Sequence, residues 1–259
     1  MPAPESADGS DDLASALADL HAEQESLRTV VAGLATDDWF RPTPARGWDV
    51  RDTIAHLADT DEIAVDTCTN GPRPLNRLAE TMASAEDVTL AGVLRGRRLP
   101  GTAVAAWWDE ASARERDVLA ALDPLTRVPW GLGMRARSFV TARLMETWAH
   151  GLDVHAALGR SPVDTDRLCH VAWLGYRSLP YAFSVAGREP PPGALRVELA
   201  GPDGDTWAFG APGAPHRVTG SAGDWCRRCV QRQDPRAPTS LKAQGDGAEA
   251  ALEVARAFL

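Results

Sequence analysis

The stretch from residue 139 to 158 constrains the fold most, because it has a helical composition but places polar residues where apolar ones are expected. Leu, Met, Ala, Glu and Arg dominate it, and Gly159 then supplies a residue suited to a left-handed helix end. Residues spaced alternately by four and three form one stripe of this helix, namely Phe139, Arg143, Glu146, His150, Asp153 and Ala157. Such spacing normally directs apolar side chains towards a neighbouring helix. Here the four middle positions are charged or titratable.

Two interpretations of this polar stripe compete. If it faces water, Arg143 and Glu146 form an ordinary surface pair that contributes little to stability. If it faces inward, a buried run of this polarity is very costly unless something binds it. The opposite side of the helix is apolar, with Leu144, Trp148 and Leu152, so the helix is expected to be buried almost all round. We therefore favour an inward-facing polar site, since buried polar clusters are usually functional or paired.

Composition excludes several classes of protein. The net charge of −9 argues against a nucleic-acid binder, which needs a basic face. No apolar run is long enough to cross a bilayer, so no membrane partner is expected. Residues 1–10 are acidic and lack the basic and apolar regions of a signal peptide, which predicts a short disordered lead in a cytoplasmic protein. Four cysteines spread over 259 residues do not make a disulfide framework.

Residues 11–189 are predicted to form a helical bundle. The first helix carries apolar residues at seven-residue spacing that are interrupted only by Gln24, namely Leu13, Leu17, Leu20, Leu27, Val31 and Leu34. A second helix starts at Trp48–Asp49, a third covers 102–122, and a loop over 124–137 leads into the polar-stripe helix. A short helix is a candidate over 75–82, and another helix is expected over 165–186. Bundle cores are a usual place for metal and cofactor sites.

The sequence pattern changes from helical to period-two alternation after the Pro-rich segment 190–193, which is the best linker candidate. Period-two alternation predicts strands near 195–199, 206–209 and 216–219, with Gly204 in a hairpin turn. Two helices, over 221–231 and 249–258, flank a possible strand at 239–243. The predicted fold class is therefore α+β, with a helical bundle followed by a small α+β domain over residues 194–259.

Glu146 and His150 lie four residues apart, so they share one helix face and can converge on one ion. This pair is only half a site. If His56 adds a third ligand from the second helix, two imidazoles and one carboxylate make a catalytic zinc set with an open position. Asp153 would then orient an imidazole, and Arg143 would hold Glu146. The alternative for His56 is a hydrogen-bonded core histidine, while His155 lies off the stripe and is assigned to packing or the surface.

Cys226 and Cys229 are separated by two residues, which is typical of redox pairs at the start of a helix. The same residues, with Trp225 and Val230, also make a simple buried helix face. We favour the buried face.

Two segments, GWDVRDTIAHL (47–57) and ARLMETWAHGLD (142–153), resemble the DinB-like superfamily, and more closely its metal-binding, mycothiol-dependent maleylpyruvate isomerase-like branch. The C-terminal pieces 218–220, 224–226 and 231–232 resemble the small α+β domain of that branch, which is similar to sterol-carrier folds. The resemblance spans nearly the whole chain. It implies an up-down-down-up four-helix bundle that binds zinc through His56, Glu146 and His150. It also implies a low-molecular-weight thiol at the open position.

Three functional hypotheses follow. In the first, the protein is an enzyme in which zinc, or another divalent metal, activates a thiol such as mycothiol, which adds to an electrophilic small-molecule substrate and gives isomerisation or thiol transfer. In the second, the same metal uses water, as in a hydrolase or lyase. In the third, the protein is a non-catalytic metal or ligand binder. A homodimer is a candidate assembly, and the sequence does not identify the substrate.

Overall fold

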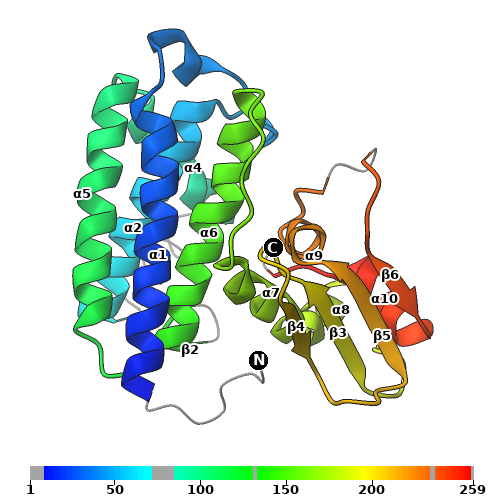
Figure 1. Cartoon of the computed structure of the whole chain (residues 1–259). Coiled ribbons are helices and arrows are strands. Elements are labelled where there is room, and N and C mark those ends of the chain that lie inside the picture. The colour runs from blue at the N-terminus through cyan, green and yellow to red at the C-terminus, as the bar shows by residue number, and fades with distance from the viewer. Residues whose placement is uncertain (1–8, 72–84, 131–132, 234–236, 258–259) are drawn as a thin grey trace. The chain divides into compact units, whose positions relative to one another are not determined.

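The computed structural model describes residues 9–71, 85–130, 133–233 and 237–257 (Figure 1). The chain divides into two compact units between Pro162 and Val163. The first unit is built on long helices, and the second combines shorter helices with a four-stranded sheet. The expected α+β fold class is confirmed.

Four long helices form the bundle of the first unit, namely α1 (Gly9–Ala32), α2 (Val50–Asn70), α5 (Gly101–Ala120) and α6 (Ala136–Ala157). The shorter α4 (Ala85–Gly96) packs against α2, and a 3-10 helix, η1 (Thr36–Phe40), precedes α2. Asp49 caps α2: its side chain accepts from the amide of Asp52, and Asp52 accepts from the amide of Asp49. The helix candidate over 75–82 lies outside the described residues.

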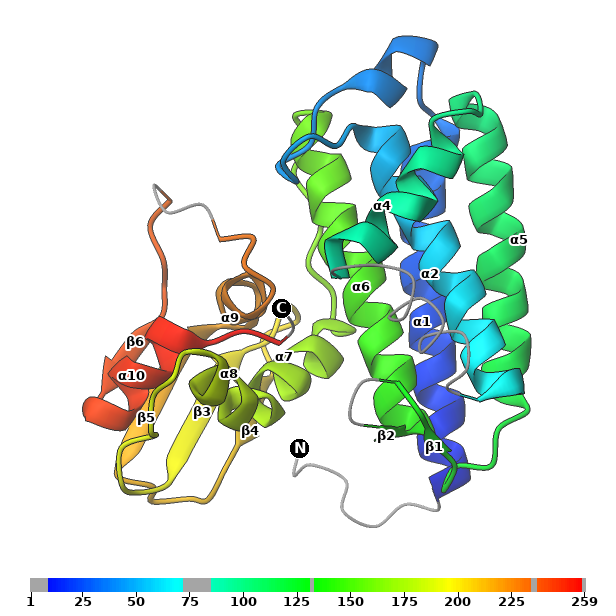
Figure 2. The same ribbon diagram turned by 180° about the vertical axis from the view of Figure 1, so that it is seen from behind.

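The helices run up-down-down-up, as the family resemblance implied. An ion pair of 2.6 Å joins Asp12, near the start of α1, to Arg137, near the start of α6, so these two helices are parallel neighbours. At the other end, the Trp39 ring after α1 packs on Gly101, where α5 begins. Figures 1 and 2 show α1 and α6 running in one direction and α2 and α5 in the other.

Two boundaries in this unit differ from expectation. The disordered lead was expected over residues 1–10, but α1 already begins at Gly9, because no helix breaker follows it; residues 1–8 lie outside the described part. The expected loop over 124–137 contains a small hairpin of β1 (Arg127–Val128) and β2 (Met134–Arg135). Gly133, with a φ of +79°, permits the reversal into β2.

The second unit contains α7 (Leu168–Arg177), α8 (Leu179–Val185), α9 (Ala222–Cys229) and α10 (Asp246–Val254). Its sheet has the order β4-β3-β5-β6, from strands β3 (Leu195–Ala200), β4 (Thr206–Phe209), β5 (His216–Ser221) and β6 (Lys242–Gln244). β3 pairs antiparallel with β4 and parallel with β5. Gly204 lies in the β3–β4 turn with a φ of +92°, as expected. The single helix expected over 165–186 is two helices, because Pro180 cannot continue the α7 hydrogen-bond ladder.

Residues 163–189 belong to the second unit, whereas the sequence pattern assigned them to the bundle. The Trp225 indole of α9 donates to the Ala172 carbonyl of α7 at 3.1 Å, and Gly175 lets Cys229 approach α7 closely. α8 in turn packs on α10. The bundle unit therefore ends at Pro162, and the 190–193 segment lies inside the second unit. Helical periodicity predicts a buried face but does not identify the partner that covers it.

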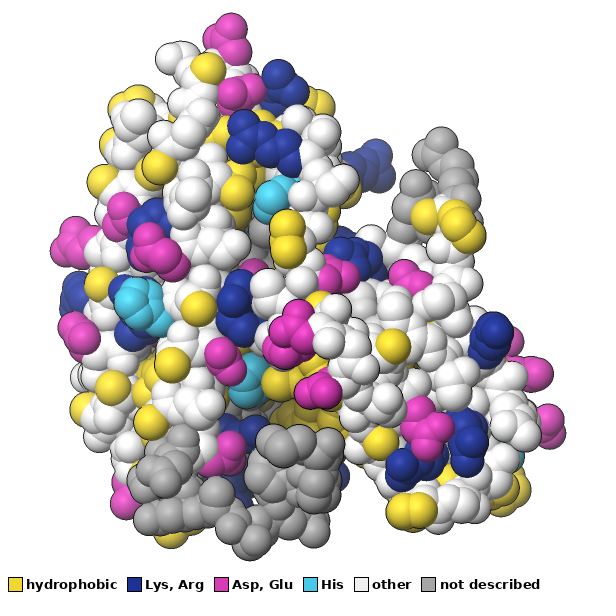
Figure 3. Space-filling view, in the orientation of Figure 1, with side chains coloured by type: hydrophobic (Ala, Val, Ile, Leu, Met, Phe, Trp, Pro, Cys, Tyr) yellow, Lys and Arg dark blue, Asp and Glu magenta, His cyan; other side chains and the backbone are white. Residues whose placement is uncertain are grey.

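The bundle surface carries charges of both signs. Figure 3 shows acidic and basic side chains interspersed on the bundle face that it draws. Within the described residues, no helix is both long enough and apolar enough to span a membrane.

Candidate metal centre

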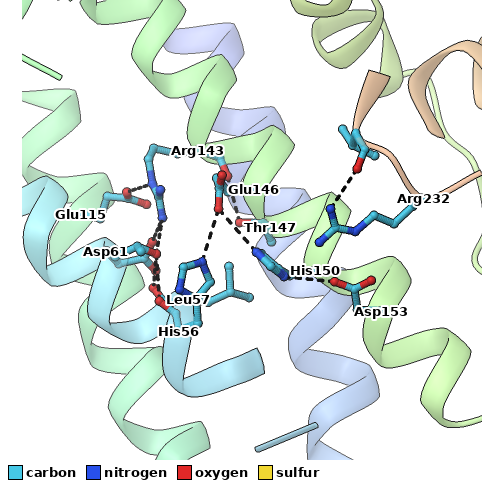
Figure 4. Close-up of polar contacts among 12 residues, drawn as sticks. His56, Leu57, Asp61, Glu115, Arg143, Glu146, Thr147, His150, Asp153 and Arg232 are labelled. Atoms are coloured by element: carbon cyan, nitrogen blue, oxygen red, sulfur yellow. Dashed lines mark hydrogen bonds and ion pairs between the residues drawn. The ribbon is translucent and has the colours of Figure 1, made fainter. Parts of the chain in front are cut away.

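Helices α2 and α6 bring together the three residues that the sequence nominated as metal ligands (Figure 4). The Glu146 Oε2 atom lies 3.7 Å from His56 Nε2 and 3.6 Å from His150 Nε2. One donor atom from each of the three residues lies within 4.8 Å of the other two. The two imidazoles meet edge to face, with ring centroids 4.7 Å apart. His56 is therefore part of a three-residue cluster rather than an isolated core histidine.

The polar stripe of α6 faces the interior of the bundle. Arg143 and Asp153 are 2% and 1% exposed, and His150 is 8% exposed. The Glu146 side chain retains 23% exposure, so the cluster is reached from outside at this carboxylate. The inward interpretation of the stripe is confirmed by this burial.

Asp153 orients His150 from behind. Its Oδ2 atom lies 3.2 Å from His150 Nδ1, one turn further along α6. A carboxylate accepts, so Nδ1 carries the proton and Nε2 presents its lone pair towards Glu146. Carboxylate–histidine pairs of this kind fix the tautomer and ring orientation of metal-binding imidazoles.

The electrostatics of the cluster favour the protonation states that metal ligands need. Burial lowers the pKa of His56, which keeps its imidazole neutral. Burial alone would raise the pKa of Glu146, but hydrogen bonding to His56 and the positive fields of His150 and Arg143 lower it to about 2. A neutral imidazole beside an ionised carboxylate suits a cation, because the imidazole adds no positive charge and the carboxylate supplies a negative one.

The donor set fits a divalent transition metal. Two imidazole nitrogens and one carboxylate oxygen are borderline donors of the kind that zinc takes in catalytic sites, and three protein ligands leave a further position open. Nickel and cobalt accept the same donors, so the donor set constrains the position of the ion more than its identity.

The sequence predicted that Arg143 holds Glu146, but the structure shows no ion pair between these two residues. Its guanidinium spans to the two neighbouring helices instead, with Nε 2.7 Å from Glu115 Oε1 and Nη2 2.6 Å from Asp61 Oδ1. Nη2 also donates to Thr60 Oγ1 at 3.1 Å. The long side chain extends past its own helix to α2 and α5, where buried carboxylates offer closer partners. Arg143 therefore acts on Glu146 through its field alone.

The triad of Arg143, Asp61 and Glu115 contains more acid than base. Burial raises the pKa of both carboxyl groups. The charge of Asp61 raises the pKa of Glu115 further, to about 8 despite the nearby guanidinium, and the charge of Glu146 raises the pKa of Asp61. Gln24 donates to Glu115 Oε2 at 3.3 Å. At neutral pH, Glu115 is therefore protonated and uncharged. The charged Arg143 guanidinium is then balanced by a single carboxylate, that of Asp61.

Sequence reasoning missed four residues around the cluster, namely Gln24, Trp48, Asp61 and Glu115. Three of them interrupt an apolar stripe, which is the signal that could have found them. Gln24 breaks the stripe of α1, Asp61 falls between Leu57 and Ala64 on α2, and Glu115 falls between Ala111 and Leu119 on α5. Trp48 gave no such signal, because it lies before α2 and its contact with both imidazoles depends on the path of the loop.

Other candidates lie away from the cluster. Cys226 and Cys229 are fully buried, and burial raises the pKa of both thiols, which supports the packing interpretation over a redox pair. His155 is half-buried on another face of α6. A cavity of about 660 Å³ lies between α2, α4 and α5, but none of the three candidate ligands lines it.

Residues 20–155 match the family model described as the mycothiol maleylpyruvate isomerase N-terminal domain. Two proteins of Mycobacterium tuberculosis, from different strains and both described as uncharacterised, are 40% identical to this chain over 248 residues. The match covers 93% of this chain and 94% of each relative.

Two solved structures share the fold. The crystal structure of the mycothiol-dependent maleylpyruvate isomerase matches with a TM-score of 0.58 and 16% identity, over 89% of this chain and 92% of that chain. A histidine-to-alanine mutant of that enzyme matches with the same TM-score and coverage at 15% identity. At these identities the likeness concerns the fold.

Proposed function

The chain belongs to the mycothiol maleylpyruvate isomerase N-terminal domain family, and from this membership we propose that it is a metal-dependent enzyme that uses a low-molecular-weight thiol. The proposed reaction is isomerisation of an electrophilic small molecule, or transfer of the thiol to it. The thiol is mycothiol, in line with the name of the family.

The convergence of His56, Glu146 and His150 carries this proposal. Three donor atoms from two helices lie within 4.8 Å of one another, so all three can reach a single cation placed between them. The low pKa of Glu146 and the lowered pKa of His56 also match ligands that are ready to bind.

A divalent cation held by these residues would supply a Lewis acid that lowers the pKa of a coordinated thiol from about 8.5 to below neutrality. The protein residues fix the geometry. His150 is held in one tautomer by Asp153, and Glu146 stays ionised in the field of Arg143. Because Glu146 is the most exposed of the three, thiol and substrate reach the site from its side.

The first experiment measures metal content. Purified protein should contain about one divalent ion per chain, by the count of one cluster of three ligands. Elemental analysis should show that His56→Ala and His150→Ala lose this ion. His21→Ala is the matched control, since this exposed histidine of α1 lies outside the cluster and its variant should keep the ion. A wild-type protein that neither contains nor takes up a divalent ion would sink the proposal.

The second experiment tests the thiol. Metal-loaded protein is assayed on maleylpyruvate and on thiol-reactive electrophiles, with and without mycothiol. Turnover that requires mycothiol and is lost in His150→Ala supports the proposal. Metal-dependent turnover without any thiol would instead favour a hydrolase or lyase, and metal binding without turnover of any of these substrates would favour a non-catalytic binder.

A further inference from the structure

Trp48 packs on both candidate imidazoles. Its ring centroid lies 5.1 Å from that of His56 and 6.1 Å from that of His150, and it is nearly parallel to the latter, at 23°. With the two imidazoles 4.7 Å apart, the three rings form one aromatic cluster at ordinary contact distances. The indole comes from the segment before α2, so it adds a wall that neither ligand-bearing helix provides.

The backbone holds Trp48 in place on both sides. The Trp48 amide donates to the Ala45 carbonyl at 3.0 Å, and the Thr43 amide donates to the Trp48 carbonyl at 2.9 Å. Gly47, with a φ of +81°, makes the left-handed step that precedes the indole. The next residue, Asp49, caps α2.

Arg97 ties the same segment to the rest of the bundle. Its guanidinium donates to the Gly47 carbonyl at 2.9 Å and pairs with the buried Asp52 carboxylate at 2.7 Å. The indole is therefore presented by a pinned segment rather than by a free loop.

The two imidazoles are supported in different ways. His150 has the Asp153 carboxylate at its Nδ1 atom, 3.2 Å away. Within the part of the chain that the structure describes, no carboxylate or carbonyl is hydrogen-bonded to the other ring nitrogen of His56, and the polar groups around this ring are Glu146, 3.7 Å from Nε2, and the His150 imidazole. Rotation of the His56 ring is limited by the rings of Trp48 and His150.

We infer that Trp48 is a positioning residue of the metal centre, and that its indole does for His56 what the Asp153 carboxylate does for His150. This role rests on the metal site proposed above. Without the indole, His56 can adopt rotamers that turn Nε2 away from Glu146, and the free protein then loses the arrangement of its three donors before any ion binds. Metal affinity should fall because this preorganisation is lost.

The test compares Trp48→Leu and Trp48→Phe with wild type. Zinc affinity is measured by competition with a chromophoric chelator, and the visible spectrum of the cobalt-loaded protein reports the ligand geometry. Trp48→Leu should lower zinc affinity by about 10- to 100-fold, the usual effect of losing a group that orients a ligand, and should change the cobalt spectrum. Trp48→Phe keeps a flat ring against the imidazoles and should stay close to wild type in both measurements.

Trp107→Leu is the matched control. Trp107 is also a half-buried tryptophan of the bundle, but its indole donates to Glu62 at 2.7 Å and stacks with Arg95. Its loss should leave zinc affinity and the cobalt spectrum unchanged. The inference is overturned if Trp48→Leu keeps wild-type affinity and spectrum, or if Trp107→Leu weakens zinc binding as much as Trp48→Leu does. A wild-type protein that binds no metal contradicts the proposed function itself, so the two failures are distinguishable.

Discussion

At the scale of the residue, Asp153 shows how one buried carboxylate determines what its neighbour can do. It is 1% exposed and lies 3.2 Å from His150 Nδ1, so it fixes the proton on that nitrogen and leaves Nε2 to face Glu146. A surface carboxylate at the same spacing would contribute only a weak, screened ion pair. Burial therefore gives this contact its effect on the candidate metal site.

Asp153→Ala should weaken metal binding by about 10- to 100-fold, because His150 loses the group that sets its tautomer. The melting temperature of the metal-loaded protein should change only slightly, even though its metal affinity falls. Zinc titration and thermal unfolding of the same samples measure both. Asp153→Asn, whose amide oxygen can still accept from Nδ1, should have a metal affinity between those of Asp153→Ala and wild type. Equal metal affinity in all three proteins would contradict the orienting role.

Glu115 predicts an unusual pH dependence for the metal-free protein. Its pKa is raised to about 8 in the folded state from an ordinary 4.5, mainly by burial. The folded chain therefore holds a proton that the unfolded chain releases between these values. Stability from this group is fully present below pH 4.5 and is lost as the pH rises towards 8, with a slope of up to about 1.4 kcal/mol per pH unit.

Urea unfolding of chelator-treated protein between pH 6 and pH 8.5 measures this slope. Glu115→Gln replaces the protonated acid with a permanently neutral group, so its stability should fall less steeply with pH than that of wild type. Glu110→Gln, at an exposed position of the same helix, should follow the wild-type profile. Parallel profiles for wild type and Glu115→Gln would show that the buried triad does not hold the proton.

Much of the site was predictable at this scale, and the reason is geometric. Residues four apart on a helix share a face, so Glu146 and His150 could be paired from spacing alone, and the motif resemblance added His56. The partners of Arg143 could not be predicted in this way, because Asp61 and Glu115 lie on two other helices. A long side chain can reach several helices, and sequence spacing on its own helix does not determine which one it pairs with.

At the scale of the element, α4 packs unusually close to α2. Two glycines of α4, Gly92 and Gly96, face α2, and a Cβ atom at Gly96 would lie 2.3 Å from the Cβ atom of Ala55. Ala55 immediately precedes His56. The close approach of the two helices therefore supports the backbone from which one candidate ligand projects.

Gly96→Ala should destabilise the protein by about 1–3 kcal/mol, the usual cost of overpacking, because α4 must move away from α2. Metal affinity should fall as well, since the backbone of His56 shifts with Ala55. Gly33→Ala is the matched control: its Cβ atom would meet nothing closer than 3.8 Å, so stability should not fall. Chemical denaturation and zinc titration check both effects. Equal stability of the Gly96 and Gly33 variants would contradict the close packing.

The helices and strands themselves followed from local patterns, whereas their grouping did not. Apolar periodicity located α1, α2 and α5 to within a few residues, because each of them buries one stripe, and helical composition located α6. Local patterns could not assign α7 and α8 to a unit, because the contacts that decide it, such as Trp225 to Ala172, join residues far apart in the chain. A proline-rich segment such as 190–193 is also compatible with a turn inside a unit.

At the scale of the whole molecule, the division at Pro162 changes what a break in the chain should do. A cut within 190–193 leaves α7 and α8 on one side and α9 and α10 on the other. These helices are held together by the Trp225 indole, by the ion pair of Arg188 with Glu253, and by the apolar cluster of Ala182, Phe183, Ala250 and Val254.

A specific protease site inserted between Pro191 and Pro192 tests this directly. After cleavage the two fragments should elute together on size exclusion and separate only in denaturant, because the packing between them stays intact. The uncleaved insertion protein is the control for effects of the added residues. Fragments that separate without denaturant would show that residues 190–193 link two independent domains, as the sequence suggested.

The two candidate imidazoles lie far apart in the chain, on the second and the last of the long bundle helices, and this has a consequence for the order of events during synthesis. His56 leaves the ribosome early, but its two partners emerge only after α4 and α5 have been made. An ion at the proposed site therefore cannot guide the first steps of folding, since no more than one of its ligands exists at that time. It can bind only at the end, after the helices of the bundle have assembled. Metal starvation should then leave folded but unloaded protein, ready to be filled when the ion returns.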